Sequence, residues 1–229
     1  MSNGLWAWDV SALVYARTYG PLAHRLDDEI ISATKAAFQG GVIVDCGCGP
    51  GVVTAKLAAA GPRLVVAVDV SQKMLDQVAP RDNVVTLQSV VEAGTLTKLR
   101  GEHAPEGFSL ILFKRSLYHP HDQAVALLRD CYANLKPGGS IAIVHPEGSV
   151  LRYAFGEPMR LRSYTPYHLF NRTISRLGVA IGGEHYTTPT REDLLALAAE
   201  VDSAAEISRI PLDQACFNLV LIRKPLTGP

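Results

Sequence analysis

Cysteine is scarce in this sequence, and its spacing excludes two of its common roles. The chain has four cysteines, Cys46, Cys48, Cys131 and Cys216. None of them forms a C-x-x-C pair or a cysteine–histidine spacing typical of a zinc site. The sequence therefore predicts neither a thiol–disulfide centre nor a metal site, and the expected location is a reducing cytoplasm.

Excess charge and long apolar runs are absent as well. Lysine and arginine together number 22, as do aspartate and glutamate, so no global field draws the chain to nucleic acid or to an anionic membrane. The stretch 1–20 lacks the charged and apolar regions of a signal peptide, and no run is long enough to cross a bilayer. We expect no nucleic-acid partner and no membrane association.

Apolar residues, by contrast, are plentiful. They make up 48% of the 229 residues, enough to fill a substantial core. A chain of this length suits one large domain, so residues 1–229 are expected to form a single unit.

One glycine-rich stretch, residues 42–51, combines the features of a ligand-binding turn. Three apolar β-formers lead into Asp45, and glycines follow at 47, 49 and 51 before a helical stretch begins. Glycines adopt positive φ cheaply and let a ligand approach the backbone. The N-terminus of the following helix offers N–H groups and a partial positive charge. A tight strand-to-helix turn that binds nothing is the alternative interpretation.

The spacing of these glycines narrows the range of possible ligands. A dinucleotide fingerprint reads G-x-G-x-x-G, whereas this stretch reads G-x-G-x-G, and no Gly-Lys-Ser/Thr follows as in a P-loop. A second acid, Asp69, ends the apolar run 64–68, where an acid in dinucleotide-binding folds accepts hydrogen bonds from ribose hydroxyls. Asp69 also has a simpler interpretation as a turn residue before a helix that Ser71 caps.

Alternating strand and helix patterns run along most of the chain. Continuous apolar runs predict buried strands at 42–44, 64–68, 84–87, 108–113 and 140–144. Helical periodicity and stop signals predict helices at 22–38, 52–60, 122–135 and 191–200. Only five residues separate two further strands, 205–210 and 216–223, which predicts an antiparallel hairpin.

The run Asp45-x-Gly47-x-Gly49-x-Gly51 resembles motif I of the class I S-adenosylmethionine (SAM) dependent methyltransferases. The resemblance implies an α/β fold, with a Rossmann-like seven-stranded mostly parallel sheet, a C-terminal antiparallel hairpin and helices on both faces. It also implies SAM as cofactor, S-adenosylhomocysteine (SAH) as product, and a small-molecule acceptor.

A second part of the chain strengthens this resemblance. A strand at 108–113, the pair Tyr118-His119, an amphipathic helix and the run Leu-Lys-Pro-Gly-Gly at 135–139 are similar to the corresponding half of the family. The family resemblance then implies cofactor contacts at Tyr15, Tyr19, Asp45, Cys46, Gly47, Gly49, Gly51, Asp69, Val70, Met74, Val90, Val91, Lys114 and Arg115.

Three positions depart from the family pattern. Val90 stands where an acid usually contacts the adenine amine, and the cations Lys114 and Arg115 stand where the family usually has a small residue. Backbone groups near Val90 still offer hydrogen bonds to an adenine edge. The two cations either point away from the cofactor or pair with a carboxylate of the cofactor or substrate.

Methyl transfer by in-line SN2 displacement needs positioning and water exclusion, and a base only where the nucleophile starts protonated. His119 and His145 follow or end strands 4 and 5, where ligands bind in open α/β sheets, and a histidine titrates near neutrality. Tyr118 is a candidate hydrogen-bond partner of the nucleophile. Each of these side chains has packing or capping as its alternative role, and no metal site is expected.

Two further segments are candidates for covering the substrate. Residues 5–39 are expected to form N-terminal lid or packing helices, with an aromatic-rich start at 5–19. An insertion at 146–186 contains an arginine- and aromatic-rich part, 151–176, suited to an aromatic or anionic molecule such as a specialised metabolite. A solvated helix pair or a dimer surface would show the same composition, so monomer and homodimer stay open.

Two other functions are compatible with part of this pattern. A SAM-binding protein of the same fold that catalyses a different reaction would share the motifs. A nicotinamide-dependent oxidoreductase is disfavoured by Val52, which stands where a third fingerprint glycine would fall, and by the terminal hairpin. Methylation of nucleic acid is disfavoured by the balanced charge and by the absence of an N/D-P-P-Y/F-like tetrapeptide.

Overall fold

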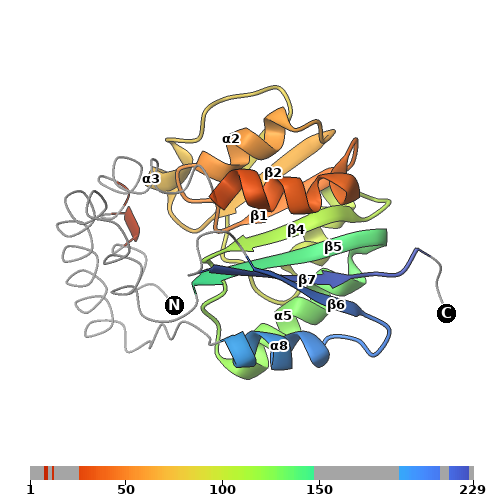
Figure 1. Ribbon diagram of the computed structural model, residues 1–229. Helices are drawn as coiled ribbons and strands as arrows, with labels where there is room; N and C mark the ends of the chain where they lie inside the picture. The colour runs from red at the N-terminus through yellow and green to blue at the C-terminus, as the bar shows by residue number, and fades with distance from the viewer. Residues whose placement is uncertain (1–7, 10–11, 13–25, 147–190, 212–216, 227–229) are drawn as a thin grey trace, which may run out of the picture.

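A single twisted sheet with helices on both sides organises the described part of the chain (Figure 1). The computed structural model describes residues 8–9, 12, 26–146, 191–211 and 217–226. The sheet has seven strands in the order β3-β2-β1-β4-β5-β7-β6. Their bounds are β1 Val42–Cys46, β2 Leu64–Asp69, β3 Val84–Gln88, β4 Phe108–Lys114, β5 Leu135–Pro146, β6 Glu206–Pro211 and β7 Phe217–Arg223.

The strand order places a topological switch point at β1. β1 pairs in parallel with β2 on one side and with β4 on the other, so the chain leaves the centre of the sheet in both directions. Ligands of open α/β sheets bind at the carboxyl ends of the strands at such a point. β7 pairs antiparallel with both β5 and β6, which confirms the predicted mostly parallel sheet with a C-terminal hairpin.

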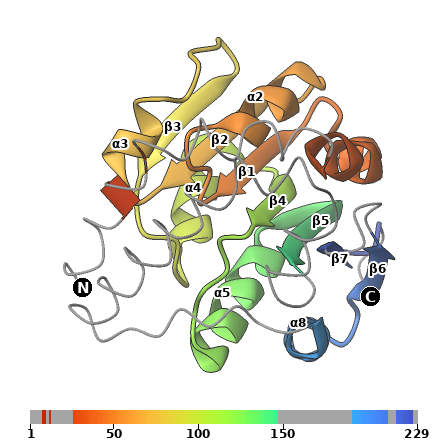
Figure 2. The same cartoon turned by 60° about the vertical axis from the view of Figure 1, so that its left-hand side comes forward.

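Helices cover both faces of this sheet (Figure 2). The helix over residues 26–38 and α2 (Val52–Ala59) pack on one face. α4 (Thr95–His103), α5 (His121–Ala133) and α8 (Arg191–Ala199) pack on the other. The short α3 (Gln72–Leu75) follows β2 at its carboxyl end. The central strands are apolar on both sides because both sides are covered.

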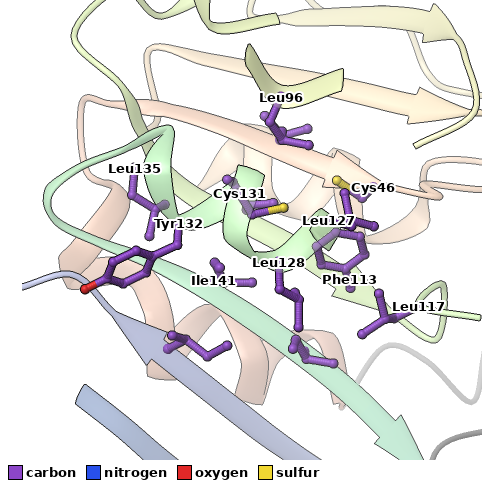
Figure 3. Packing of buried hydrophobic residues seen from close by; sticks show 14 of the residues in the cluster. Cys46, Leu96, Phe113, Leu117, Leu127, Leu128, Cys131, Tyr132, Leu135 and Ile141 are labelled. Carbon is purple, nitrogen blue, oxygen red and sulfur yellow. The ribbon is translucent and has the colours of Figure 1, made fainter. Parts of the chain in front are cut away.

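The larger core lies between α5 and the sheet (Figure 3). Leu127, Leu128 and Cys131 of α5 are fully buried and belong to the same cluster as Phe113 and Ile141 of the sheet. Burial raises the pKa of the Cys131 thiol well above its usual value, and the same holds for Cys46. Both cysteines therefore act as small apolar packing residues.

One helix, α4, was not predicted. It begins after Gly94, which has no side chain to cap it, and its last turn contains Gly101, a poor helix former. Its cap comes from Asp130 of α5, whose Oδ2 accepts hydrogen bonds from the backbone N–H groups of Gly94 (2.9 Å) and Leu96 (3.0 Å). A cap supplied from another helix leaves no signal in the local sequence.

β5 also differs from its prediction, since it begins at Leu135 rather than at residue 140. Leu135 pairs with Phe108, and the register then shifts before Leu110 pairs with Ser140. The Lys-Pro-Gly-Gly run at 136–139 is therefore an irregular part of the strand rather than only a helix stop. Within the described residues, no helix is both long and apolar enough to cross a membrane.

Candidate functional site

Asp45 lies near the end of β1, and only one of its two carboxylate oxygens has a hydrogen-bond partner among the described residues. The residue is 1% exposed, and Thr54 of α2 donates a hydrogen bond from Oγ1 to Asp45 Oδ2 at 2.6 Å. Asp45 Oδ1 is buried and has no hydrogen-bond partner in the described part of the chain. Burial raises the pKa of Asp45 to about 6, although the Thr54 hydrogen bond and the Lys114 cation oppose the shift. A buried acceptor without a protein donor is available to a ligand or to an ordered water.

Asp69, at the end of β2, connects two turns. Its Oδ2 accepts from the backbone N–H of Gly49 at 2.8 Å, and its Oδ1 accepts from that of Ser71 at 2.9 Å. Ser71 in turn caps α3, because its Oγ accepts from the N–H of Met74 at 3.2 Å, as the sequence predicted. Burial raises the pKa of Asp69, and these backbone hydrogen bonds oppose the shift. Each carboxylate oxygen keeps a lone pair for a ligand.

The backbone N–H groups of the glycine loop donate hydrogen bonds to acceptors within the protein. Those of Gly47 (2.7 Å) and Cys48 (3.0 Å) both donate to the carbonyl of Val68, that of Gly49 donates to Asp69, and that of Gly51 donates to Cys48 (3.2 Å). A pyrophosphate is normally held by such backbone amides and by the helix N-terminus behind them. With these amides occupied and two carboxylates beside them, the loop suits a ligand that carries cationic and hydroxyl groups.

Gly47 is required by both its backbone angle and its surroundings, which predicts a measurable difference from Gly40. Gly47 has φ +70° and a Cβ there would lie 2.5 Å from Ser116 Cβ, whereas Gly40 has φ +68° with nothing within 4 Å. Gly40→Ala should cost only the left-handed backbone penalty, about 1–2 kcal/mol. Gly47→Ala should cost roughly 1 kcal/mol more, because the loop and Ser116 must move apart. Urea unfolding of both variants measures the difference, and equal losses would contradict it.

Lys114 is held by an ion pair rather than facing the solvent. At the end of β4 it contacts Asp27, a fully buried residue on the helix over residues 26–38. Arg115 follows with φ +59°, and its N–H donates to the carbonyl of Val144 at 2.9 Å. The left-handed conformation is uncommon for a residue with a side chain and clusters at functional sites.

An aromatic cluster of Trp8, Tyr118 and His145 lies near the carboxyl ends of β4 and β5. The rings of Trp8 and Tyr118 stack with centroids 6.4 Å apart and an angle of 25°, and those of Tyr118 and His145 meet edge to face at 6.1 Å and 83°. His145 is 1% exposed, and neither ring nitrogen has a partner in the described part of the chain. Burial lowers its pKa to about 4, and Arg115 adds to the shift, so its ring is neutral at physiological pH.

Two further histidines, His119 and His121, follow β4 and have different surroundings. His119 Nε2 lies 2.8 Å from the carbonyl oxygen of Val91, which only accepts, so Nε2 carries the proton in the neutral ring. His119 Nδ1 is buried without a partner among the described residues. His121 begins α5, and its Nε2 lies 3.0 Å from Glu200 Oε1 at the exposed surface.

The described residues of the N-terminal segment cross the carboxyl edge of the sheet. Ser71 Oγ donates to Asp9 Oδ1 at 2.5 Å, and Gln77 Nε2 donates to the carbonyl of Ala12 at 3.0 Å. Figure 2 shows this short red segment beside α3. Because Trp8 also stacks on Tyr118 after β4, the segment connects the turn after β2 with the loop after β4.

The remaining predicted cofactor residues line the turns after β2 and β3. Met74 on α3 is 2% exposed, and Val70 between Asp69 and Ser71 is half-buried. Val90 is 44% exposed, and its carbonyl accepts from Ser89 Oγ at 3.0 Å. Tyr15, Tyr19 and the segment 151–176 lie outside the described residues. Sequence reasoning missed the contributions of Asp9, Asp27 and Thr54.

No cluster of three or more histidine, cysteine, aspartate or glutamate side chains suited to a metal ion occurs among the described residues.

Known proteins resemble this chain in sequence and in fold. Residues 43–139 match the family described as a methyltransferase domain. A curated relative, cypemycin N-terminal methyltransferase from Streptomyces sp., is 35% identical over 108 residues, which is 45% of this chain and 41% of that protein. The match thus spans less than half the length of the relative.

Solved structures share the fold across most of the chain. The N-methyltransferase NodS from Bradyrhizobium japonicum WM9 superposes with a TM-score of 0.60 at 13% identity, over 90% of this chain and 97% of that one. Magnesium protoporphyrin IX methyltransferase (ChlM) from Synechocystis PCC 6803, solved with bound SAM, gives a TM-score of 0.58 at 13% identity, over 92% and 89% of the chains.

The order of the seven strands, the two acids around the glycine loop and the match over residues 43–139 lead to one conclusion. Residues 43–139 match a methyltransferase domain, and the chain has the fold of solved methyltransferases, one of them with bound SAM.

Proposed function

We propose that this protein transfers a methyl group from SAM to an oxygen or nitrogen of a small molecule. The observation that carries the proposal is the pair of buried acids, Asp45 and Asp69, on either side of a glycine loop whose own amides are occupied. This arrangement favours a ligand with an amino group, hydroxyls and no phosphate. The N-methyltransferase and N-terminal methyltransferase names of two relatives support nitrogen as one acceptor atom.

The residues present fit SAM. The open Oδ1 of Asp45 offers an acceptor to its amino group, and the lone pairs left on Asp69 offer acceptors to the ribose hydroxyls. Met74 and the turn at 88–92 provide an apolar and backbone-lined surface for adenine. SAM supplies a methyl group that its sulfonium already activates, so the protein needs to position the acceptor and exclude water.

The chain's own residues near the acceptor have distinct tasks in this proposal. The neutral ring of His145 orients the acceptor group and receives a hydrogen bond from it. Tyr118 and Trp8 cover the site against water. His119, with one nitrogen on the carbonyl of Val91, connects the loops after β3 and β4 and is the second candidate to contact the reacting groups.

Turnover distinguishes the proposal from its alternatives. Purified protein is incubated with SAM and a panel of small hydroxyl and amine acceptors, and SAH and methylated products are measured by mass spectrometry. The proposal expects both to accumulate in equal amounts. Product without SAH would indicate a SAM-binding protein that catalyses another reaction, and saturable quenching of reduced nicotinamide fluorescence would indicate an oxidoreductase.

The same proposal includes the domain organisation, the substrate class and the location of the enzyme. Residues 1–229 would form one domain, with the N-terminal segment and the insertion at 146–186 covering the acceptor. The balanced charge supports a small molecule rather than nucleic acid as substrate, and a cytoplasmic location agrees with the three cysteines that are free and buried in the described part of the chain.

A further inference from the structure

The turn at residues 88–92, between β3 and α4, offers backbone donors and has an apolar side chain at its centre. Val90 is 44% exposed, and its side chain has neither a donor nor an acceptor. The N–H groups of Val90 and Val91 donate to no acceptor in the described part of the chain. The backbone of this exposed turn is therefore what can recognise the hydrogen-bonding edge of a planar base.

Hydrogen bonds hold one side of this turn against the end of β2. The N–H of Ser89 donates to the carbonyl of Asp69 at 3.0 Å. Gln88 Nε2 donates to the carbonyl of Val70 at 3.2 Å. The Ser89 hydroxyl also donates to the carbonyl of Val90 at 3.0 Å, within the turn itself. These contacts fix the turn relative to Asp69, the residue proposed to hold the ribose hydroxyls.

His119 holds the other side of the turn from the loop after β4. Its Nε2 lies 2.8 Å from the carbonyl oxygen of Val91, which is 28 positions earlier in the chain. A carbonyl oxygen only accepts, so Nε2 carries the proton and donates it. The imidazolium has a proton on Nε2 as well, so the donor is present in either form of the ring. The bond restrains the backbone at Val91, whose own N–H is one of the two unused donors.

We propose that His119 is a positioning residue for cofactor selectivity: by holding Val91 it places the unused N–H groups of the turn where they pair with adenine and reject other purines. Val90 supplies no acid, so selectivity for the base depends on where the backbone lies. Hydrogen bonds weaken steeply when their angle is poor, so a loosened turn loses this selectivity. The inference rests on the proposed function, since it concerns the base of the same cofactor, and it needs no contact between His119 and that cofactor.

Two ligands that differ only in the base test the inference. SAH carries adenine, whose N1 accepts a hydrogen bond and whose amine donates. S-inosylhomocysteine carries hypoxanthine, whose N1–H donates and whose carbonyl accepts, so an N–H of the turn that pairs with adenine N1 meets a second N–H. Calorimetric titration of the purified protein with each ligand gives the selectivity as the ratio of the two dissociation constants.

Matched variants separate the contact to Val91 from other effects. His119→Leu removes the donor, and His119→Gln keeps an N–H donor at a similar reach. His119→Asn keeps an amide that is too short to reach Val91, and it replaces the leucine variant if that variant does not fold. His121→Leu is the control, because this exposed histidine lies two positions further along and pairs with Glu200 instead.

We expect the parent protein to bind SAH at least about tenfold tighter than S-inosylhomocysteine, the value of one mispaired hydrogen bond. His119→Leu should weaken SAH binding about fivefold and leave S-inosylhomocysteine binding unchanged, so the selectivity falls by the same factor. His119→Gln should restore most of the selectivity, and His121→Leu should not alter it.

Three results would overturn the inference while the proposed function stands. They are equal binding of the two ligands by the parent protein, equal losses for both ligands in His119→Leu, and no recovery in His119→Gln. A folded protein that binds no SAH would overturn the proposed function and the inference together.

Discussion

Replacing Asp69 with alanine is expected to weaken SAH binding roughly a hundredfold or more, the equivalent of about 3 kcal/mol. The carboxylate accepts the N–H of Gly49 and the N–H of Ser71, so its loss leaves two donors unpaired and loosens both turns. It also removes the acceptor proposed for the ribose hydroxyls. Isothermal titration calorimetry of the variant with SAH measures the effect.

A matched control separates this effect from a general loss of an acid. Asp82 is exposed, so Asp82→Ala should leave SAH affinity unchanged. Asp69→Asn tests the geometry further, because an amide keeps one acceptor oxygen and should lose less affinity than alanine. Unchanged affinity in Asp69→Ala would mean that the ligand does not reach this side of the loop.

Replacing Asp45 with asparagine is expected to stabilise the ligand-free protein while weakening cofactor binding. The pKa of Asp45 is raised in the folded state to about 6 from the ordinary 3.8, mainly by burial. The folded state therefore holds the proton more tightly than the unfolded state. Stability falls as pH rises through this window, and above it the ionised carboxylate costs about 3 kcal/mol.

Asparagine removes that cost, because it is neutral at every pH and still offers an oxygen to Thr54. Asp45→Asn should raise the free energy of unfolding by about 2–3 kcal/mol at roughly pH 7.5 and change it little near about pH 4. Urea unfolding of the ligand-free variant and parent at both pH values measures the difference, with Asp82→Asn as the exposed control. A variant that is less stable than its parent at the higher pH would contradict the account.

The same acid gives cofactor binding a pH dependence. An ionised Asp45 is the better acceptor for an amino group, so SAH affinity should fall as pH drops through about 6 in the parent protein. Asp45→Asn should bind weakly at all pH values in this range. If the SAH affinity of the parent protein does not change across this pH range, Asp45 does not contact the ligand.

Most of the sheet was predictable because its signals are local. Val42–Val44 and Val65–Val68 are continuous apolar runs, and such runs form strands when helices cover both faces. The hairpin of β6 and β7 followed from the short connection between two apolar stretches. Asp45 and Asp69 were identifiable because each acid ends a strand next to a turn.

The features that the sequence did not predict depend on contacts between residues far apart in the chain. The cap of α4 comes from Asp130, which lies 36 positions after Gly94. The partner of Lys114 is Asp27, 87 positions earlier, so the sequence left open whether this cation faced the ligand. The hydrogen bonds that the Gly47 and Gly49 amides form with β2 could not be predicted either, because they depend on where β2 and its last residue lie. None of these pairings has a spacing that a single sequence reveals.

A calorimetric titration of the protein with SAH tests the central claim, that the glycine loop between Asp45 and Asp69 is a SAM site. The account predicts saturable binding at a single site, strongly weakened in Asp69→Ala and absent when reduced nicotinamide dinucleotide replaces SAH. No heat of binding at millimolar SAH, with a folded protein, would contradict it.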